Sequence, residues 1–204
     1  MRRIPLSRRS HIIGFQPLAT GTTEHESALE RDFVTLTTFL HPYASFTSQP
    51  VTLTFSDGPR TRRYTPDFLV RYRGDHAELV EVKYRTDLRA NFAQLRPGFE
   101  AARRWAGEHG FIFRIATERG IRGPTLDNAK RLLPLRDAPV DLAVAEFVLA
   151  KARASRDATF GEVLAALPVS REIGLATLWR MIAQRTLRVD FATAITFTTR
   201  VSVT

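Results

Sequence analysis

The sequence predicts an α/β fold, a mixed sheet flanked by helices, followed by a small C-terminal domain of helices with a terminal hairpin. Three observations support this prediction. A helical pattern of apolar residues runs up to residue 40, short apolar segments separated by turn residues follow between 51 and 84, and the pattern changes beyond the prolines at 134 and 139.

The first helix is predicted over residues 27–40. Leu29, Phe33 and Leu36 recur at the spacing of one helix face, and His41-Pro42 ends the pattern. Three strands are then expected at 51–55, 64–72 and 79–84, joined by turns at 56–59 and at Gly74-Asp75, which together predict an antiparallel meander.

A second helical face runs from Phe92 to Ala106, and Pro97-Gly98 predicts a kink or a restart within it. An apolar strand at 111–115 and a short helix at 126–133 complete the α/β core. The expected order is therefore α-β-β-β-α-β-α, in a first domain that we place at residues 1–136.

The second domain is predicted at residues 137–204. Helices are expected at 142–153 and 172–184, and Thr159-x-x-Glu162 has the form of a capping box that opens a helix over 163–167. Alternating apolar residues then predict strands at 187–191 and 195–201. Three helices followed by a hairpin favour a winged-helix domain.

Composition narrows the classes of function. The 204 residues contain no cysteine, and the five histidines lack the i, i+4 spacing of a helical metal pair, so any metal must rest on oxygen ligands. No stretch approaches the roughly 18 apolar residues of a membrane span. We therefore expect a cytoplasmic protein with no membrane partner.

The net charge of +9 is unevenly distributed. Residues 1–136 hold 22 basic and 14 acidic residues, a net +8, whereas residues 137–204 hold 8 and 7, a net +1. A basic excess suits phosphate contacts as well as solubility. Arg60, Arg62 and Arg63 either follow a DNA backbone or form a solvated cluster beside a turn. For the C-terminal domain, the near-neutral charge favours docking of a partner protein over direct binding of DNA.

The chemically informative residues lie on two successive predicted strands. Glu81 and Lys83 project to one face because strand side chains alternate, and pairing across the turn at 74–75 brings Asp67 beside them. Two carboxylates and an ammonium suit hydrolysis of a phosphodiester with Mg²⁺, which Asp67 and Glu81 would hold. Lys83 would position or help deprotonate the attacking water and would offset the charge that develops on phosphorus. The alternative is a solvated ion pair of Glu81 with Lys83, with Asp67 in a turn.

The first helix offers a further carboxylate. Glu30 lies three residues before the apolar Phe33 and is close enough to the buried face to reach the sheet as another metal ligand. Glu26 and Asp32 compete for that role, and the spacing alone leaves the choice open.

Pro66-Asp67, thirteen intervening residues and Glu81-x-Lys83 have the form of the PD-(D/E)xK motif of restriction-endonuclease-like proteins. Residues 10–135 resemble the TnsA-type endonucleases of heteromeric transposons. The likeness rests on the helix 26–33, on Gln49-Pro50, on the strand 64–68, on Glu81-Val82-Lys83 and on the 117–128 stretch. The chain departs from the pattern at Glu81, where a TnsA member has glutamine.

The resemblance implies catalytic roles for Glu30, Asp67, Glu81 and Lys83, with Glu30, Asp67 and Glu81 as ligands of Mg²⁺, for which Mn²⁺ could substitute. It further implies cleavage of double-stranded DNA at transposon ends, beside a transposase subunit and an ATPase regulator, and a winged-helix C-terminal domain. Two alternatives stay open: another nuclease of the same fold, such as a junction resolvase or restriction enzyme, and a non-catalytic DNA-binding adaptor.

Overall fold

The computed structural model describes residues 14–18, 21–25, 27–155 and 157–204. The contacts divide the chain into two compact units, Met1–Arg122 and Gly123–Thr204. The division lies before the boundary expected after residue 136, because helix α4 (Pro124–Leu132) packs with helices of the second unit. The units then carry net charges of +6 and +3, a weaker asymmetry than the predicted domains gave.

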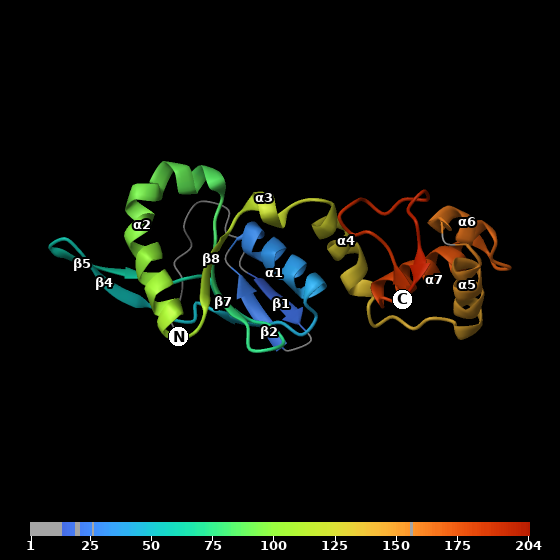
Figure 1. The fold of residues 1–204 in the computed structure, drawn as a ribbon, viewed down its shortest axis with the longest axis horizontal. Helices are drawn as coiled ribbons and strands as arrows, with labels where there is room; N and C mark the ends of the chain where they lie inside the picture. Colours follow the sequence, from blue (N-terminus) through green and yellow to red (C-terminus); the bar gives the residue numbers. More distant parts are fainter. Residues whose placement is uncertain (1–13, 19–20, 26, 156) are drawn as a thin grey trace. The chain divides into compact units, whose positions relative to one another are not determined.

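The first unit is built on a four-stranded sheet with the order β3-β6-β7-β8, of which β7 and β8 are labelled in Figure 1. The strands are β3 (Ser45–Ser48), β6 (Phe68–Arg71), β7 (Ala77–Val82) and β8 (Ile112–Ala116). β3 and β7 are antiparallel to β6, whereas β8 runs parallel to β7. The sheet is therefore mixed, as predicted.

Helix α1 (Ala28–Leu40) begins at Ser27, whose hydroxyl accepts a hydrogen bond from the Glu30 amide at 3.1 Å. Its buried residues include Leu29, Phe33 and Phe39, and the Phe33 ring stacks on Phe68 of β6 with the centroids 5.8 Å apart. α1 therefore covers the face of the sheet that carries Phe68, as its apolar spacing predicted.

Helix α2 (Arg85–Glu108) contributes Ala101, Ala102 and Ala106 to a cluster with Leu69 and Leu79. Because Leu69 and Leu79 alternate with Phe68 and Val80, α2 packs on the sheet face opposite to α1. Pro97 lies inside α2, which is continuous and bends strongly along its length (Figure 1), in agreement with the predicted kink.

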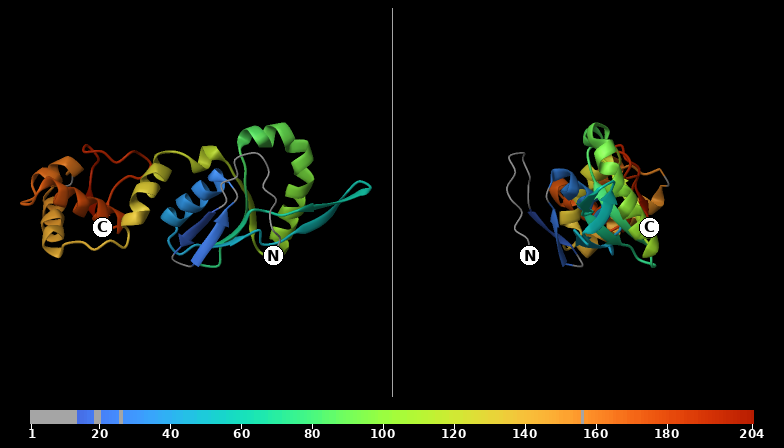
Figure 2. Two further views of the ribbon diagram at one scale, coloured as in Figure 1. Left: turned by 180° about the vertical axis from the view of Figure 1, so that it is seen from behind. Right: turned by 90° about the vertical axis from the view of Figure 1, so that its left-hand side faces the viewer.

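The predicted meander is wrong in one respect. Strands β4 (Leu53–Asp57) and β5 (Arg60–Tyr64) form a separate antiparallel hairpin, which extends away from the sheet (Figures 1 and 2). The single strand expected at 64–72 is interrupted at Thr65–Asp67, since Pro66 has no amide hydrogen to donate to a ladder. β6 pairs instead with β3, which the sequence did not predict.

Three further elements of the first unit were not predicted. β1 (Gly14–Leu18) and β2 (Gly21–His25) pair antiparallel, and the short helix α3 (Glu118–Ile121) follows β8. Among the described residues, no helix combines the length and the apolar character that crossing a membrane would require.

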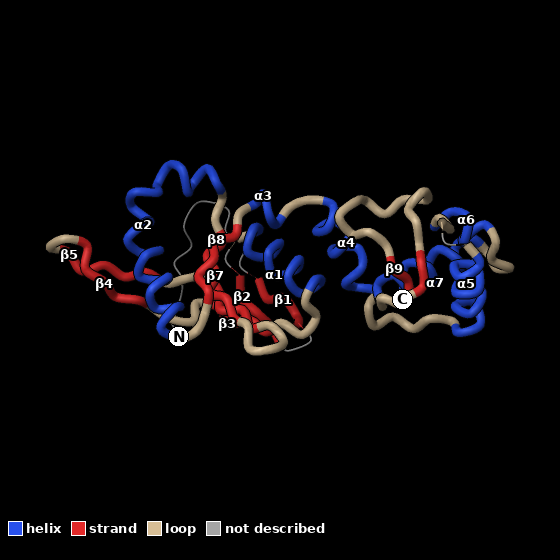
Figure 3. Tube along the Cα trace, in the orientation of Figure 1, coloured by secondary structure: helices blue, strands red, loops and turns tan. Residues whose placement is uncertain are grey.

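The second unit contains α4, a 3₁₀ turn η1 (Leu133–Leu135), α5 (Leu142–Ala154), α6 (Phe160–Ala165) and α7 (Arg171–Ala183) (Figure 3). The capping box of Thr159 with Glu162 is present, as predicted. The core includes Val148, Phe160, Leu178 and Ile182.

The two terminal strands are much shorter than expected. β9 (Leu187–Arg188) pairs antiparallel with β10 (Ser202–Val203). Between them, Asp190 accepts from the Ala192 amide at 2.9 Å, and Thr199 accepts from the Thr196 amide at 2.9 Å. These side chains occupy backbone donors that a longer ladder would need. The three helices predicted after residue 137 are present as α5, α6 and α7, together with the short strand pair, and their classification as a winged helix stays a prediction.

Candidate active site

Asp67 lies directly before β6, at the start of that strand. Its carboxylate oxygen Oδ2 accepts a hydrogen bond of 2.7 Å from the Val82 amide at the end of β7. Its backbone carbonyl accepts from the Gln49 amide at 2.8 Å, just after β3. Asp67 is therefore held at one end of the sheet, where β7 ends.

Glu81 is buried on β7, with only 2% of its surface exposed. Its Oε2 accepts a hydrogen bond of 2.7 Å from the Tyr64 hydroxyl, and its Oε1 pairs with the Lys83 ammonium. The Lys83 amide donates to the Ala116 carbonyl at 2.9 Å, which ties the chain after β7 to the end of β8. The solvated ion pair considered for Glu81 and Lys83 is therefore not what the structure contains, because Glu81 is inside the protein.

Glu30 lies in the first turn of α1 and is partly buried. The Ser27 hydroxyl donates to its Oε1 at 2.8 Å, and the negative charge of Glu30 acts on Asp67 electrostatically. The structure thus gathers all four predicted residues, Glu30, Asp67, Glu81 and Lys83, near one end of the sheet.

The electrostatics of the cluster are dominated by carboxylates. Burial raises the pKa of Asp67 well above its ordinary value, and the charges of Glu81 and Glu30 raise it further, whereas the Val82 hydrogen bond and Lys83 offset this only in part. Burial lowers the pKa of Lys83, but the charge and hydrogen bond of Glu81, together with the charges of Asp67 and Asp87, outweigh that effect, and the pKa is raised overall. The four predicted residues therefore comprise one ammonium and three carboxyl groups.

The donors fit a divalent cation that takes few ligands from the protein. In the described part of the chain, no three histidine, aspartate or glutamate side chains are arranged to hold a metal between them. Mg²⁺ commonly uses one or two carboxylates and fills its other positions with water and phosphate oxygens. Asp67 and Glu81 meet that need, and an added positive charge would relieve the repulsion that raises the pKa of Asp67. Glu30 as a third ligand stays a prediction.

Of Asp32 and Glu26, the two acids that competed with Glu30 as a metal ligand, the structure describes Asp32. Asp32 is buried, and its Oδ2 pairs with the Arg122 guanidinium at 3.0 Å. Arg122 also donates to the Tyr84 hydroxyl at 3.1 Å and lies over that ring. Asp32 therefore anchors α1 to the segments that follow β7 and α3. Glu26 lies outside the described residues.

The three predicted DNA-contacting arginines lie on the β4–β5 hairpin. Arg60 and Arg63 are exposed, whereas Arg62 is partly buried and pairs with Asp57 at 2.8 Å. Gly58, with φ of +61°, forms the tight turn of this hairpin. The hairpin ends at Tyr64, whose hydroxyl contacts Glu81, so the strand that carries the arginines leads directly into the carboxylate cluster.

Tyr64 is the residue that sequence reasoning missed. Burial and the charge of Glu81 raise the pKa of its hydroxyl, which therefore stays protonated and donates to the carboxylate. A tyrosine three residues before the motif aspartate was visible in the sequence. Its contact with Glu81, however, depends on the course of the hairpin, which was not predicted.

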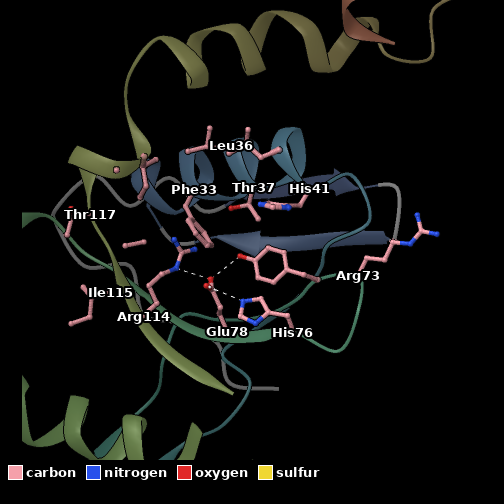
Figure 4. Close-up of a pocket in the computed structure, with 15 residues that line it drawn as sticks. Phe33, Leu36, Thr37, His41, Arg73, His76, Glu78, Arg114, Ile115 and Thr117 are labelled. Carbon is pink, nitrogen blue, oxygen red and sulfur yellow. Dashed lines mark hydrogen bonds and ion pairs between the residues drawn. The ribbon is translucent and has the colours of Figure 1, made fainter. Parts of the chain in front are cut away.

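The other face of β7 carries a second polar cluster, separate from the four predicted residues. Glu78 accepts from Tyr72 at 3.0 Å, pairs with Arg114 at 2.8 Å and lies 3.6 Å from His76 (Figure 4). Burial and the charge of Glu78 raise the pKa of Tyr72 to about 12. The cluster lines a cavity of about 640 Å³ beside α1, whose other walls include Phe33, Leu36, Thr37, Leu40, His41, Ile115, Thr117 and Ile121.

Comparison with known proteins finds one similarity, which lies within the first unit. Residues 43–118 match the family model described as TnsA-like endonuclease N terminal. The matched segment contains Asp67, Glu81 and Lys83 but begins after α1, so it does not include Glu30, whose catalytic role stays a prediction. A comparison with curated proteins finds no match. Residues 43–118 are therefore similar to the N-terminal domain of the TnsA-like endonucleases, in agreement with the family resemblance inferred from the sequence.

Proposed function

We propose that the protein is a Mg²⁺-dependent DNA endonuclease that cleaves double-stranded DNA at transposon ends, together with a transposase subunit and an ATPase regulator. The observation that carries this proposal is the gathering of Asp67, Glu81 and Lys83 at the end of β7, within a TnsA-like endonuclease domain. Endonucleases of this family act in transposition, and this supports the role at transposon ends.

Each residue has a distinct task in the proposed reaction. Asp67 and Glu81 would hold Mg²⁺, which when bound supplies a Lewis acid for the phosphate oxygens. The Val82 amide keeps the Asp67 carboxylate at the strand end, and the packing of β7 keeps Glu81 in place. The raised pKa of Lys83 keeps it an ammonium, which suits stabilisation of negative charge at the phosphate better than removal of a proton.

The β4–β5 hairpin provides the surface for DNA. Arg60 and Arg63 are exposed on a strand that runs into the site, so they are placed to contact phosphates beside the scissile bond. Such contacts position a duplex without specifying its sequence. Selection of transposon ends would then fall to the partner subunits.

The second unit is proposed to be a winged-helix domain that docks a partner protein. Several large apolar side chains are exposed on it, namely Leu142 (79%), Phe147 (49%), Ile173 (50%) and Phe197 (49%). Its net charge of +3 is lower than the +6 of the first unit. Apolar exposure of this kind suits a protein interface better than a polyanion.

The test is cleavage of a DNA duplex that carries a transposon end, with Mg²⁺ or with a chelator, in the presence of the transposase and the ATPase regulator. Asp67→Ala and Lys83→Ala should each reduce cleavage by orders of magnitude while the protein stays folded, since in the proposed site both would act at the reacting phosphate. Glu78→Gln is the matched control, because it changes a glutamate of the same strand on the opposite face. Cleavage by both alanine variants at the wild-type rate would refute the site, and DNA binding without any cleavage by the wild type would favour an adaptor.

A further inference from the structure

Tyr64 joins three parts of the first unit. It is the last residue of β5, paired with Leu53 of β4, and its ring lies edge-on to Phe99 of α2 with the centroids 5.9 Å apart. Its hydroxyl donates to Oε2 of Glu81 on β7 at 2.7 Å. This one side chain of the β4–β5 hairpin therefore contacts both α2 and the candidate metal ligand Glu81.

The space for the Tyr64 ring comes from Gly98. A Cβ atom added at Gly98 would lie 3.0 to 3.3 Å from three carbon atoms of Tyr64, which is closer than almost all real contacts of Cβ atoms. Glycine is an unfavourable residue inside a helix, so its presence in α2 needs a local reason. Close approach of the tyrosine ring supplies that reason.

Glu81 is fixed by this arrangement. Lys83 holds one carboxylate oxygen and Tyr64 holds the other, and the rest of the side chain is buried. A carboxylate with donors on both oxygens cannot rotate freely. Hydrogen bonds of this kind orient the carboxylates that bind metals, and their loss typically costs about 10–100-fold in metal affinity or activity.

We propose that Tyr64 is a positioning residue, which orients the Glu81 carboxylate for the metal and links the arginine hairpin to it. This inference rests on the proposed function, because it assumes that Glu81 binds the metal. Tyr64 itself does not contact the metal or the DNA phosphate. Its effect is exerted through Glu81 alone.

The experiment measures Mn²⁺ binding to the full-length protein without DNA, by electron paramagnetic resonance titration. Tyr64→Phe should weaken Mn²⁺ binding by about 10–100-fold, since it removes only the hydroxyl. Tyr72→Phe is the matched control, because it removes a hydroxyl that donates to Glu78 on the other face of β7 (Figure 4). Binding by Tyr64→Phe that equals binding by Tyr72→Phe would overturn the proposal.

A second pair of variants tests the same idea without removing the hydroxyl. Gly98→Ala should displace the Tyr64 ring and weaken Mn²⁺ binding, whereas Gly107→Ala, in the same helix with no atom within 4 Å of the added Cβ, should not. Alanine favours the helix at both positions, so a loss at Gly98 alone cannot come from unfolding of α2.

A further variant separates the two proposals. If the wild type binds Mn²⁺ and Asp67→Asn does not, the result supports the metal site itself. If that site is present and Tyr64→Phe binds normally, only the positioning role fails. Absence of any Mn²⁺ binding that depends on Asp67 would overturn the metal-dependent function and the positioning role together.

Discussion

Asp67→Asn should make the metal-free protein more stable while it abolishes cleavage. The Asp67 carboxylate lies near Glu81 and Glu30, and burial together with these charges raises its pKa. Asparagine is nearly isosteric and keeps an oxygen that can accept from the Val82 amide, so the substitution removes the charge and preserves the hydrogen bond. Activity and stability should therefore change in opposite directions.

The sign of the pH dependence follows from the raised pKa. Protonated Asp67 stabilises the fold at pH below its ordinary value of 3.8, and this contribution is lost as the pH rises through the raised pKa of the folded state. At neutral pH the charged form destabilises the metal-free protein. The substitution should then increase the free energy of unfolding by about 0.5–2 kcal/mol, the range that stabilising single substitutions commonly give.

The metal should reverse this order. A ligand present at 100 times its dissociation constant stabilises the state that binds it by about 2.7 kcal/mol, so Mg²⁺ should stabilise the wild type and leave Asp67→Asn unchanged. Thermal unfolding would be followed at several pH values, with chelator and with Mg²⁺, for both proteins. Two results would refute the reasoning: a less stable Asp67→Asn protein in chelator, or equal stabilisation of both proteins by Mg²⁺.

Two other predictions concern the first helix and the DNA-binding surface. Glu30→Gln should reduce cleavage more than Glu26→Gln, because the charge of Glu30 acts on Asp67. If kinetic assays showed the Glu26 variant to be the more impaired, the catalytic glutamate would have been assigned to the wrong turn of the first helix. Removal of Gly123–Thr204 should leave most of the salt dependence of DNA binding. The double variant Arg60→Ala, Arg63→Ala should instead lower the slope of the logarithm of the DNA-binding constant against the logarithm of the salt concentration by about 2, because each lost phosphate contact removes about 0.9. A truncated protein that loses most of the slope in titrations at several salt concentrations would show that the second unit holds DNA directly.

The strand pair that carries the site was predictable from the sequence. Alternation along 79–84 places Glu81 and Lys83 together, and the turn at Gly74 and Asp75, both with positive φ, pairs β7 with β6 as expected. A strand pair closed by a short turn is a local feature, so periodicity and turn residues suffice to predict it. The gathering of Asp67 with Glu81 follows from that pairing.

The remaining parts depend on contacts between distant residues. β3 pairs with β6 over Ser45↔Arg71 to Ser48↔Phe68, and four residues without a clear apolar alternation do not indicate such a partner. The separation of the β4–β5 hairpin from the sheet likewise depends on Pro66, which the sequence prediction placed inside one strand over 64–72. Tyr64 could not be assigned a role before the course of this hairpin was known.

The burial of Glu81 is the strongest physical argument for a function. A buried ion pair gains little stability over apolar residues of similar size, because both charges must leave water. Glu81 is nonetheless almost inaccessible, and its partner Lys83 has 30% of its side chain exposed. If the pair served only to stabilise the fold, apolar residues at these positions would stabilise it at least as well, since the strand already contains Leu79, Val80 and Val82. A carboxylate is present there beside Asp67 despite its cost, and the proposed coordination of a cation at the sheet end would account for that arrangement.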